Sequence, residues 1–303
     1  DHRETMKGKT TMTNFIKNPA NPIYGGPSTG TLFDVLVTRD GGRYRMDFSW
    51  RPKKALAVAF SDDGVHWSEP EITLPCDPTN GWEDNCNRNC VIKVGDEWKM
   101  WYTGQARGYS FIGGAVSRDG VHFERVSREP MIIPERQFEG MSVMNPCVLY
   151  ENGVYRMWYA AGETYEPNVL ALATSTDGIN WTKDRINPIF VKDASNEYER
   201  DRVGGCQVLR TELGYLMFYI GYRDINTACI CAALSPDGRT GWKRCKLNPL
   251  VTPTDGEWDA DSCYKPSALY DNGSWRIWYN GRKKYDEYIG EASMKGDFTP
   301  DMF

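Results

Sequence analysis

A short motif, Ser-x-Asp-Gly-x-x-aromatic, recurs along the whole chain and constrains the fold more than any other feature. Copies begin at Ser61, Ser117 and Ser175, a longer copy SPDGRTGW begins at Ser235, and a degenerate copy SMKGDF begins at Ser293. Consecutive copies therefore start 56, 58, 60 and 58 residues apart. A fixed period of this size is typical of repeated supersecondary units. The sequence predicts five similar units that fill the chain.

A second repeated feature lies upstream of each motif, where aromatic residues and Met or Ile alternate with other residues. These strips are Tyr44, Met46, Phe48; Trp98, Met100, Tyr102; Tyr155, Met157, Tyr159; Tyr215, Met217, Tyr219; and Trp275, Ile277, Tyr279. Alternation with period two is typical of β-strands, and the Asp-Gly and Asn-Gly pairs before several strips predict hairpins. Four antiparallel strands in each of five units predict an all-β fold, a five-bladed β-propeller.

The two ends of the chain are expected to complete one another. The last motif ends at Phe298 with almost no chain left for an outer strand, whereas Asn21-Pro22-Ile23 matches Asn187-Pro188-Ile189 and Asn248-Pro249-Leu250, which follow earlier motifs. We expect these segments to be outer strands, and residues 15–24 to close the last blade beside residues 286–294. This closure removes free sheet edges. Residues 1–303 are then a single domain, with 1–14 a flexible N-terminal segment.

Composition narrows the class of protein. The net charge of −5 and the pI near 5.4 disfavour a nucleic-acid partner, which usually requires a basic face. No apolar run reaches membrane-spanning length, so we expect no membrane partner. The N-terminus lacks the apolar core of a signal peptide, although a removed leader stays open because the chain does not begin with Met. A homo-oligomer also stays open.

The nine cysteines do not form a metal-binding or disulfide pattern. Their odd number and scattered spacing favour reduced thiols in a cytoplasmic protein. Cys90, Cys147 and Cys206 fall at or next to equivalent strand heads, which predicts small buried core residues, whereas Cys86 and Cys263 are expected in loops and are the candidates for reactivity. We expect no metal and no cofactor.

An aromatic-acid pair precedes the inner strand in four of the five units. The pairs are Trp82-Glu83, Phe138-Glu139, Tyr198-Glu199 and Trp258-Asp259. A feature present in four units out of five is more typical of architecture than of catalysis. These acids are therefore predicted to be structural.

The candidate site lies where the heads of the inner strands meet the loops around the axis. The residue before each strand head gives a polar ring that breaks the fivefold pattern: Asp34, Asn89, Asn145, Gly205 and Lys265. The loops after the second strands add Arg51, Gln105, Arg107, Glu163, Arg223, Asp224 and Arg282, and the crossings between units add Asp84, Arg88, Asp201, Arg202 and Asp261. Carboxylates, arginines, amides and aromatic rings around one pocket favour a carbohydrate partner.

These features together resemble the five-bladed propeller glycosidases, a superfamily that includes glycoside hydrolase families 32, 43, 68, 117 and 130. The resemblance rests on the repeated turns, on strips such as WKMWYTG and YRMWYAAG, and on the acid in TLFDVLV. It implies that Asp34 is the nucleophile or base. Two departures stand out, because Asn145-Pro146 and Gly204-Gly205-Cys206 occupy positions where such enzymes often carry further acids.

Glycoside cleavage needs two carboxyl groups in different environments, one to protonate the leaving oxygen and one to attack or to activate water. Asp34 is the predicted base or nucleophile, and Lys265 in the neighbouring blade would favour its ionised form. Glu163, Asp201 and Asp261 are the candidate acids, with Asp201 preferred. The predicted function is an exo-acting glycoside hydrolase. The alternatives are a family 130 type phosphorylase and a non-catalytic glycan-binding propeller.

Overall fold

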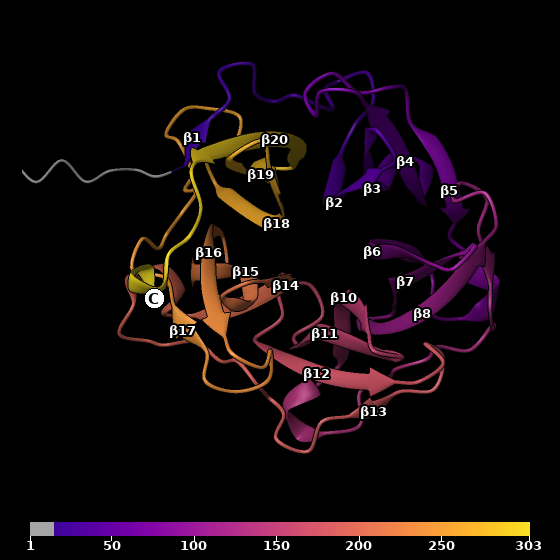
Figure 1. Cartoon of the computed structure of the whole chain (residues 1–303). Coiled ribbons are helices and arrows are strands. Elements are labelled where there is room, and N and C mark those ends of the chain that lie inside the picture. The colour runs from indigo at the N-terminus through magenta and orange to yellow at the C-terminus, as the bar shows by residue number, and fades with distance from the viewer. Residues whose placement is uncertain (1–14) are drawn as a thin grey trace, which may run out of the picture.

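The computed structural model describes residues 15–303, and the expected flexible segment 1–14 lies outside the described residues. This part of the chain is all-β, with twenty strands, five short 3-10 segments and no α-helix between residues 15 and 303. Figure 1 shows the strands arranged around a central axis, with β2, β6, β10, β14 and β18 innermost. None of the helical segments described is long and apolar enough to span a membrane.

The strands pair in five antiparallel groups of four; four groups are consecutive in the sequence, and the fifth combines β18 to β20 with β1. The first group contains β2 (Leu32–Asp40), β3 (Arg43–Trp50), β4 (Ala55–Ser61) and β5 (Glu71–Pro75). The second contains β6 (Asn85–Val94), β7 (Glu97–Ala106), β8 (Tyr109–Ser117) and β9 (Glu124–Arg125). The third contains β10 (Ser142–Glu151), β11 (Val154–Gly162), β12 (Val169–Ser175) and β13 (Thr182–Lys183).

The remaining elements complete this arrangement. The fourth group contains β14 (Arg202–Thr211), β15 (Gly214–Asp224), β16 (Thr227–Ser235) and β17 (Lys243–Arg244). The fifth contains β18 (Ser262–Asp271), β19 (Ser274–Lys283), β20 (Asp286–Lys295) and β1 (Ile16–Lys17). Single parallel pairs, Ser110 with Ser142 and Ala228 with Ser262, join groups two to three and four to five. The 3-10 segments are η1 (Arg51–Lys53), η2 (Pro78–Asn80), η3 (Gln137–Glu139), η4 (Glu197–Glu199) and η5 (Pro300–Met302).

The repeated motif forms a turn that is held by its own side chains. In the first copy, Ser61 Oγ accepts a hydrogen bond from Gly64 N at 2.8 Å, and Asp63 Oδ1 accepts from the backbone N–H groups of Val65 and His66 at 2.8 Å each. The same bonds recur in the copies at 117, 175 and 235. Short polar side chains that bond to nearby backbone favour turns. This requirement explains the fixed Ser-x-Asp-Gly spacing.

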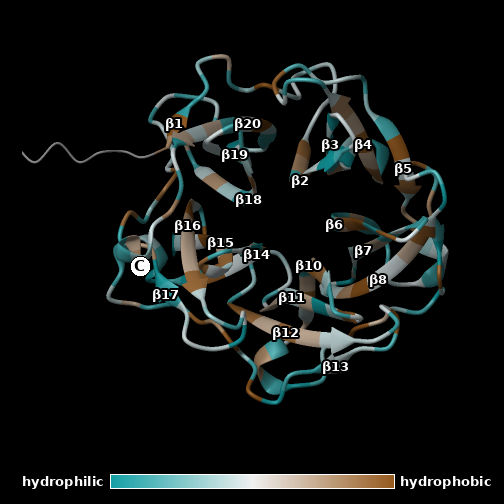
Figure 2. Ribbon diagram, viewed as in Figure 1, coloured by the Kyte–Doolittle hydropathy of each residue, from teal (hydrophilic) through white to brown (hydrophobic). Residues whose placement is uncertain are grey.

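Buried tryptophans link neighbouring groups. The indole N–H of Trp101 donates to Gly178 O at 2.9 Å, and that of Trp158 donates to Gly238 O at 2.8 Å. Trp278 in β19 donates to Gly64 O at 2.9 Å and so connects the fifth group to the first. In Figure 2 hydrophobic stretches follow strands such as β4, β5 and β16, whereas many connecting loops are hydrophilic. The core consists of separate hydrophobic clusters, which lie between each pair of neighbouring groups.

The four aromatic-acid pairs contribute to a buried clamp. Glu83 is fully buried and accepts a hydrogen bond from the Tyr102 hydroxyl at 2.6 Å while it pairs with Arg125 of β9. Glu139 contacts Tyr159 and Lys183 in the same way, and Glu199 contacts Tyr219 and Arg244. Each clamp ties the crossing before an inner strand to the second strand and to the outermost strand of the same group. These contacts support the structural role predicted for the acids.

The N-terminal strand supplies the same clamp to the fifth group. Lys17 Nζ lies 2.6 Å from Asp259 Oδ2, and that carboxylate also accepts from the Tyr279 hydroxyl at 3.0 Å. Strand β1 pairs with β20 through Ile16 with Ser293 and Lys17 with Ala292. Tyr24 forms a further bridge with Ile289. The predicted pairing of residues 15–24 beside residues 286–294 is confirmed.

The Asn-Pro segments act differently from the prediction. The outermost strands of groups three to five have two residues each and precede these segments, so the Asn-Pro segments are not strands of their own. Instead, Asn187 accepts from Leu172 N and donates to Leu172 O, both at 2.9 Å. Asn248 bonds Ala232 and Asn21 bonds Glu291 in the same two-way pattern. The amide side chain thus replaces one residue of strand pairing.

The inner strands share a bulge at their heads. The register shifts between Phe33 and Leu36 in β2, and equivalent shifts occur in β6, β10, β14 and β18. A bulge re-aims side chains locally. The first bulge residue has a left-handed φ at Asp34, Arg88, Asn145 and Lys265, with values of 61°, 31°, 56° and 54°. The ring predicted from the sequence is therefore wrong in the second group, where Arg88 and not Asn89 is the equivalent residue, because this crossing is one residue shorter.

All nine cysteines are free. Eight are buried and only Cys76 is partly exposed. Cys86 and Cys263 lie inside β6 and β18 and are buried, so their expected loop positions are wrong. The hydrogen bond from the Cys86 thiol lowers the pKa of Cys76, which favours its reactive thiolate.

We expect Lys17→Met to destabilise the protein, because it leaves the buried Asp259 carboxylate without its cation. Breaking a buried pair by removing one member costs about 3 kcal/mol. The free energy of unfolding is measured by chemical denaturation. Lys99→Met is the matched control, since its pair with the more exposed Glu97 is worth at most about 1 kcal/mol. An equal loss in both variants would contradict the clamp.

Thiol titration tests the cysteine assignment. In the native protein we expect Cys76 to react first and the eight buried thiols to react slowly. In denaturant without reductant all nine thiols should titrate. Cys76→Ser should remove the fast phase. A denatured count below nine would reveal a disulfide and contradict the reduced state.

Candidate active site

A cavity of about 220 Å³ lies at the heads of the inner strands, where the sequence analysis placed the site. Its walls come from all five groups, through inner strands and through the loops that follow the second strands. The polar lining residues are Asp34, Arg51, Asn87, Gln105, Asn145, Glu166, Lys265, Arg282 and Glu287, and the aromatic ones are Phe33, Tyr165, Tyr222 and Tyr264. We call this the central cavity.

Asp34 is the most constrained carboxylate in the central cavity. It is 1% exposed, and its Oδ1 lies 3.0 Å from Lys265 Nζ. Its Oδ2 accepts hydrogen bonds from Ser49 Oγ at 3.3 Å and from Arg88 N at 3.2 Å. A nearby cation and hydrogen-bond donors both favour the ionised form of a carboxylate. The predicted contact between Lys265 and Asp34 is confirmed.

Lys265 is positioned by the aromatic rings around it. Its Nζ lies 4.6 Å from the centroid of the Phe33 ring and 4.9 Å from that of Tyr264. Cation–π contacts of this kind hold an ammonium group in place. The backbone N–H of Asp34 donates to Asn280 Oδ1 at 2.9 Å, which fixes β2 against β19. The Asp34 and Lys265 pair is therefore rigidly mounted.

Glu166 is a second carboxyl group in the central cavity, and sequence reasoning missed it. It lies in the loop after β11, and the Tyr222 hydroxyl donates a hydrogen bond to its Oε2. Burial raises its pKa, and nearby Glu287 raises it further. Lys265, Tyr222 and Arg282 oppose the rise without cancelling it. Glu166 therefore holds its proton more tightly than an ordinary glutamate.

Glu287 is the third carboxyl group, and it was also missed. It is 6% exposed near the start of β20 and accepts a hydrogen bond from Asn280 Nδ2 at 3.2 Å. Small residues occupy comparable strand starts in other groups, Ser110 in β8 and Ala228 in β16. This departure from the repeat was visible in the sequence, as it was for Asp34.

Gly205 leaves room for the Asn145 side chain. A Cβ at position 205 would lie 2.7 Å from Asn145 Nδ2, which is closer than real Cβ contacts come. The backbone N–H of Asn145 donates to Thr103 Oγ1 at 2.9 Å. Gly205 in the fourth group therefore leaves the space that the Asn145 amide of the third group occupies. This steric requirement explains why the fourth group has a glycine where the other groups have polar side chains.

The acids Glu163 and Asp201 lie outside the lining of the central cavity. Both pair with Arg202, whose Nη1 is 2.6 Å from Glu163 Oε2 and whose Nε is 2.6 Å from Asp201 Oδ2. Arg202 also donates to Glu166 O at 2.8 Å. This ion triad supports the loop that carries Glu166.

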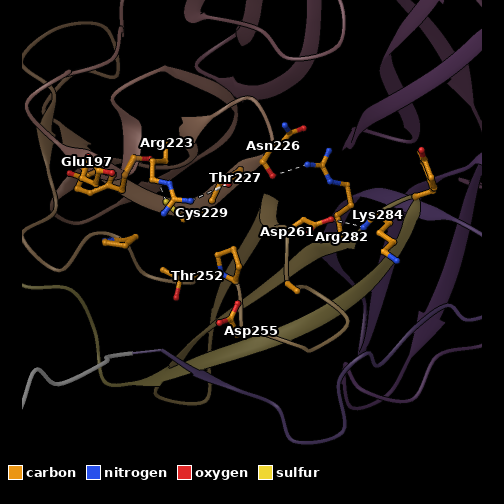
Figure 3. Close-up of a pocket in the computed structure, with 16 residues that line it drawn as sticks. Glu197, Arg223, Asn226, Thr227, Cys229, Thr252, Asp255, Asp261, Arg282 and Lys284 are labelled. Carbon is orange, nitrogen blue, oxygen red and sulfur yellow. Dashed lines mark hydrogen bonds between the residues drawn. The ribbon is translucent and has the colours of Figure 1, made fainter.

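Asp261 lines a different and larger cavity, of about 1050 Å³, between the fourth and fifth groups. Figure 3 shows Asp261, Lys284 and Arg282 on one side and Arg223 on the other. Asp261 Oδ2 accepts from Lys284 N at 2.5 Å, and Arg223 Nε is 3.5 Å from Asp224 Oδ2. Arg282 lines both cavities. The structure therefore separates Asp261 and Arg223 from Asp34 and connects them only through Arg282.

The other predicted residues do not line the central cavity. Asp84 and Arg107 are exposed, and Arg107 donates to Gly81 O at 2.9 Å. Arg88 is buried behind Asp34, and its guanidinium donates to Cys206 O at 3.2 Å. Asn89 is buried, and its amide has no hydrogen-bond partner in residues 15–303. Within the same residues no group of three or more His, Cys, Asp or Glu side chains could hold a metal ion.

The model of the glycosyl hydrolases family 32 N-terminal domain matches residues 38–188. An uncharacterized protein of Mycobacterium tuberculosis is 27% identical over 231 residues, which cover 69% of this chain and 74% of the relative. An A type blood N-acetyl-alpha-D-galactosamine deacetylase of Flavonifractor plautii is 25% identical over 296 residues. That match covers 80% of this chain but only 38% of the deacetylase.

Solved structures share the fold at low identity. A β-1,2-mannobiose phosphorylase from Listeria innocua aligns with a TM-score of 0.70 and 16% identity, covering 93% of this chain and 97% of the other. A thermostable family-43 glycoside hydrolase aligns with a TM-score of 0.71 and 18% identity, covering 89% and 91%. The fold is that of the β-propeller glycosidases. Together with the family model, this fold supports the propeller glycosidase superfamily and points to no single family within it.

Proposed function

We propose that the protein is a glycoside hydrolase whose central cavity holds a terminal sugar between Asp34 and Glu166. One observation supports this most strongly. Two carboxyl groups line the same small cavity in different environments: Asp34 is paired with Lys265, and Glu166, beside Tyr222, has a raised pKa. Pairs of carboxyl groups that differ in this way divide the roles of acid and base in glycoside cleavage.

In this proposal each carboxyl group has one task. Glu166 keeps its proton and donates it to the departing glycosidic oxygen. Asp34, paired with Lys265, either attacks the anomeric carbon or activates a water molecule. Arg282, Asn145 and Gln105 offer donors for sugar hydroxyls. Glu163, Asp201 and Asp261, predicted from the sequence, are the competing acids.

The size of the cavity supports exo action. About 220 Å³ is below the range of roughly 300–1,000 Å³ that is usual for pockets that take drug-sized ligands. Such a space suits one sugar ring rather than an extended chain. The same proposal takes the five groups of strands as the five blades of a single propeller domain, because Trp278 and β1 join the last group to the first and to the N-terminus.

A phosphorylase is the second candidate. Three cations, Arg51, Lys265 and Arg282, line the central cavity and favour an anionic co-substrate. Dependence of turnover on inorganic phosphate separates phosphorolysis from hydrolysis. A panel of aryl glycosides with and without phosphate, including N-acetylated sugars with acetate release followed, identifies the reaction. Binding without any turnover would leave the third alternative, a non-catalytic glycan-binding propeller.

We expect Asp34→Asn to abolish turnover while the fold persists. The change keeps the shape and removes the charge, so kcat should fall by about a thousandfold or more with near-normal sugar binding. Asp62→Asn, in an exposed turn, is the control. Thermal melting establishes that both variants are folded. Turnover above about a tenth of wild type would make Asp34 structural, since that is a barrier change of only about 1.4 kcal/mol.

If Glu166 is the general acid, the loss of kcat in Glu166→Gln should depend on the leaving group of the substrate. Substrates with poor leaving groups should lose about a hundredfold or more in kcat, whereas activated aryl glycosides should lose much less, because their leaving oxygen needs no proton. In the wild type, kcat should fall as the pH rises through the raised pKa of Glu166, and the variant should lose that limb.

The exposed Glu212→Gln serves as the control for this experiment. If Asp201→Asn, Glu163→Gln or Asp261→Asn shows the dependence on the leaving group and Glu166→Gln does not, the acid is assigned to that residue instead.

A further inference from the structure

A second pocket of about 280 Å³ adjoins the central cavity. The two share Arg51, Asn87, Gln105 and Tyr165, so a ligand in one lies beside a ligand in the other. Trp50, Lys54, Asn85 and Cys86 complete the lining. Neither the function proposed above nor the comparisons assign a role to this pocket, which we call the side pocket.

The side pocket has positive charge and no acid in its lining. Arg51 and Lys54 both line it, and none of the lining residues is Asp or Glu. Neither side chain makes an ion pair or a side-chain hydrogen bond within residues 15–303. The larger cavity near Asp261 differs, because its three cations are mixed with three acids. Two unneutralised cations in one concave site attract an anion.

The backbone of Lys54 and the guanidinium of Arg51 are both held by neighbouring groups. Lys54 has a left-handed φ of 45°, and its N–H donates to Arg51 O at 3.0 Å. Its carbonyl accepts from Cys76 N at 2.9 Å. The Arg51 guanidinium stacks over Phe33 with its carbon 4.4 Å from the ring centroid, which leaves its N–H edge free to donate. The Arg51 guanidinium therefore has a defined position at the pocket, and the Lys54 backbone has a defined position beside it.

The shared amides are also fixed. Gln105 Oε1 accepts from Asn87 Nδ2 at 2.5 Å, and Gln105 Nε2 donates to Ser110 Oγ at 3.0 Å and to Thr164 O at 3.2 Å. These bonds tie the wall between the two cavities to β6, β7, β8 and the loop that carries Glu166. The wall that the side pocket shares with the central cavity is thus hydrogen-bonded to its surroundings.

We propose that the side pocket binds an anionic group, a carboxylate or a phosphate, next to the sugar in the central cavity. The inference rests on the proposed function for its placement beside a sugar. The anion is either the carboxylate of an acidic sugar in the substrate or free inorganic phosphate. Arg51 would bind it through paired N–H donors and Lys54 through its ammonium.

Isothermal titration calorimetry at constant ionic strength tests the inference on the full chain. The probes are glucuronate, galacturonate and inorganic phosphate, with glucose and galactose as neutral counterparts. At least one anion should bind, and Arg51→Gln and Lys54→Gln should each weaken it by about tenfold or more. Lys53→Gln is the matched control, because it removes the same charge next to Lys54 but does not line the pocket.

The outcomes separate the two sources of the anion. Tight uronate binding that depends on Arg51 and Lys54 identifies an acidic sugar, and phosphate binding with the same dependence identifies free phosphate. Binding that Lys53→Gln weakens equally, or no anion binding at about 10 mM, overturns the inference. Asp34→Asn should keep the anion affinity. Anion binding without glycoside turnover would therefore refute only the proposed function, and turnover without anion binding would refute only the inference.

Discussion

The fold depends on buried carboxylates that each need both a hydroxyl and a cation. Glu83, Glu139, Glu199 and Asp259 are 0–1% exposed, and an unpaired charge at that depth would be costly. Their cations come from outermost strands of only two residues, whose backbone pairing alone is weak. The ion pair therefore holds the edge of each sheet in place. In the fifth group the cation is Lys17, from the opposite end of the chain. The strand that completes the fifth sheet therefore also closes the ring.

Closure also brings together two residues of the candidate site. Asp34 and Lys265 are 231 positions apart in the sequence, yet their charged atoms are 3.0 Å apart because the first and fifth groups are neighbours. The Trp278 bond to Gly64 and the Asn280 bond to Asp34 N reinforce the same junction. The third group places Glu166 opposite this junction through a loop that Arg202 supports. The geometry of the candidate site and the closure of the ring therefore depend on the same contacts.

The repeat made most of the fold predictable, because the turn motif and the aromatic strips each encode a local structure. The same repeat made Asp34 and Lys265 visible as departures from a pattern. Glu166 was missed because its loop has no counterpart of equal length, so the repeat gives no reference there, and the nearby Glu163 was chosen instead. The misplacement of Asn89 had a related cause, since one crossing is a residue shorter. The side-chain pairing of Asn187 could not be foreseen, because it depends on a neighbouring strand.

The bulge at the head of each inner strand separates residues that pair within the sheet from residues that do not. The hydrogen-bonded ladder resumes after the bulge, so the residues at positions 34, 88, 145 and 265 stand outside the regular pairing of their own sheets. Some of their side chains contact other groups instead, since Asp34 pairs with Lys265 of the fifth group and Arg88 donates to Cys206 O of the fourth. The bulge thus converts one residue of an inner strand from pairing within a sheet to contact across the axis.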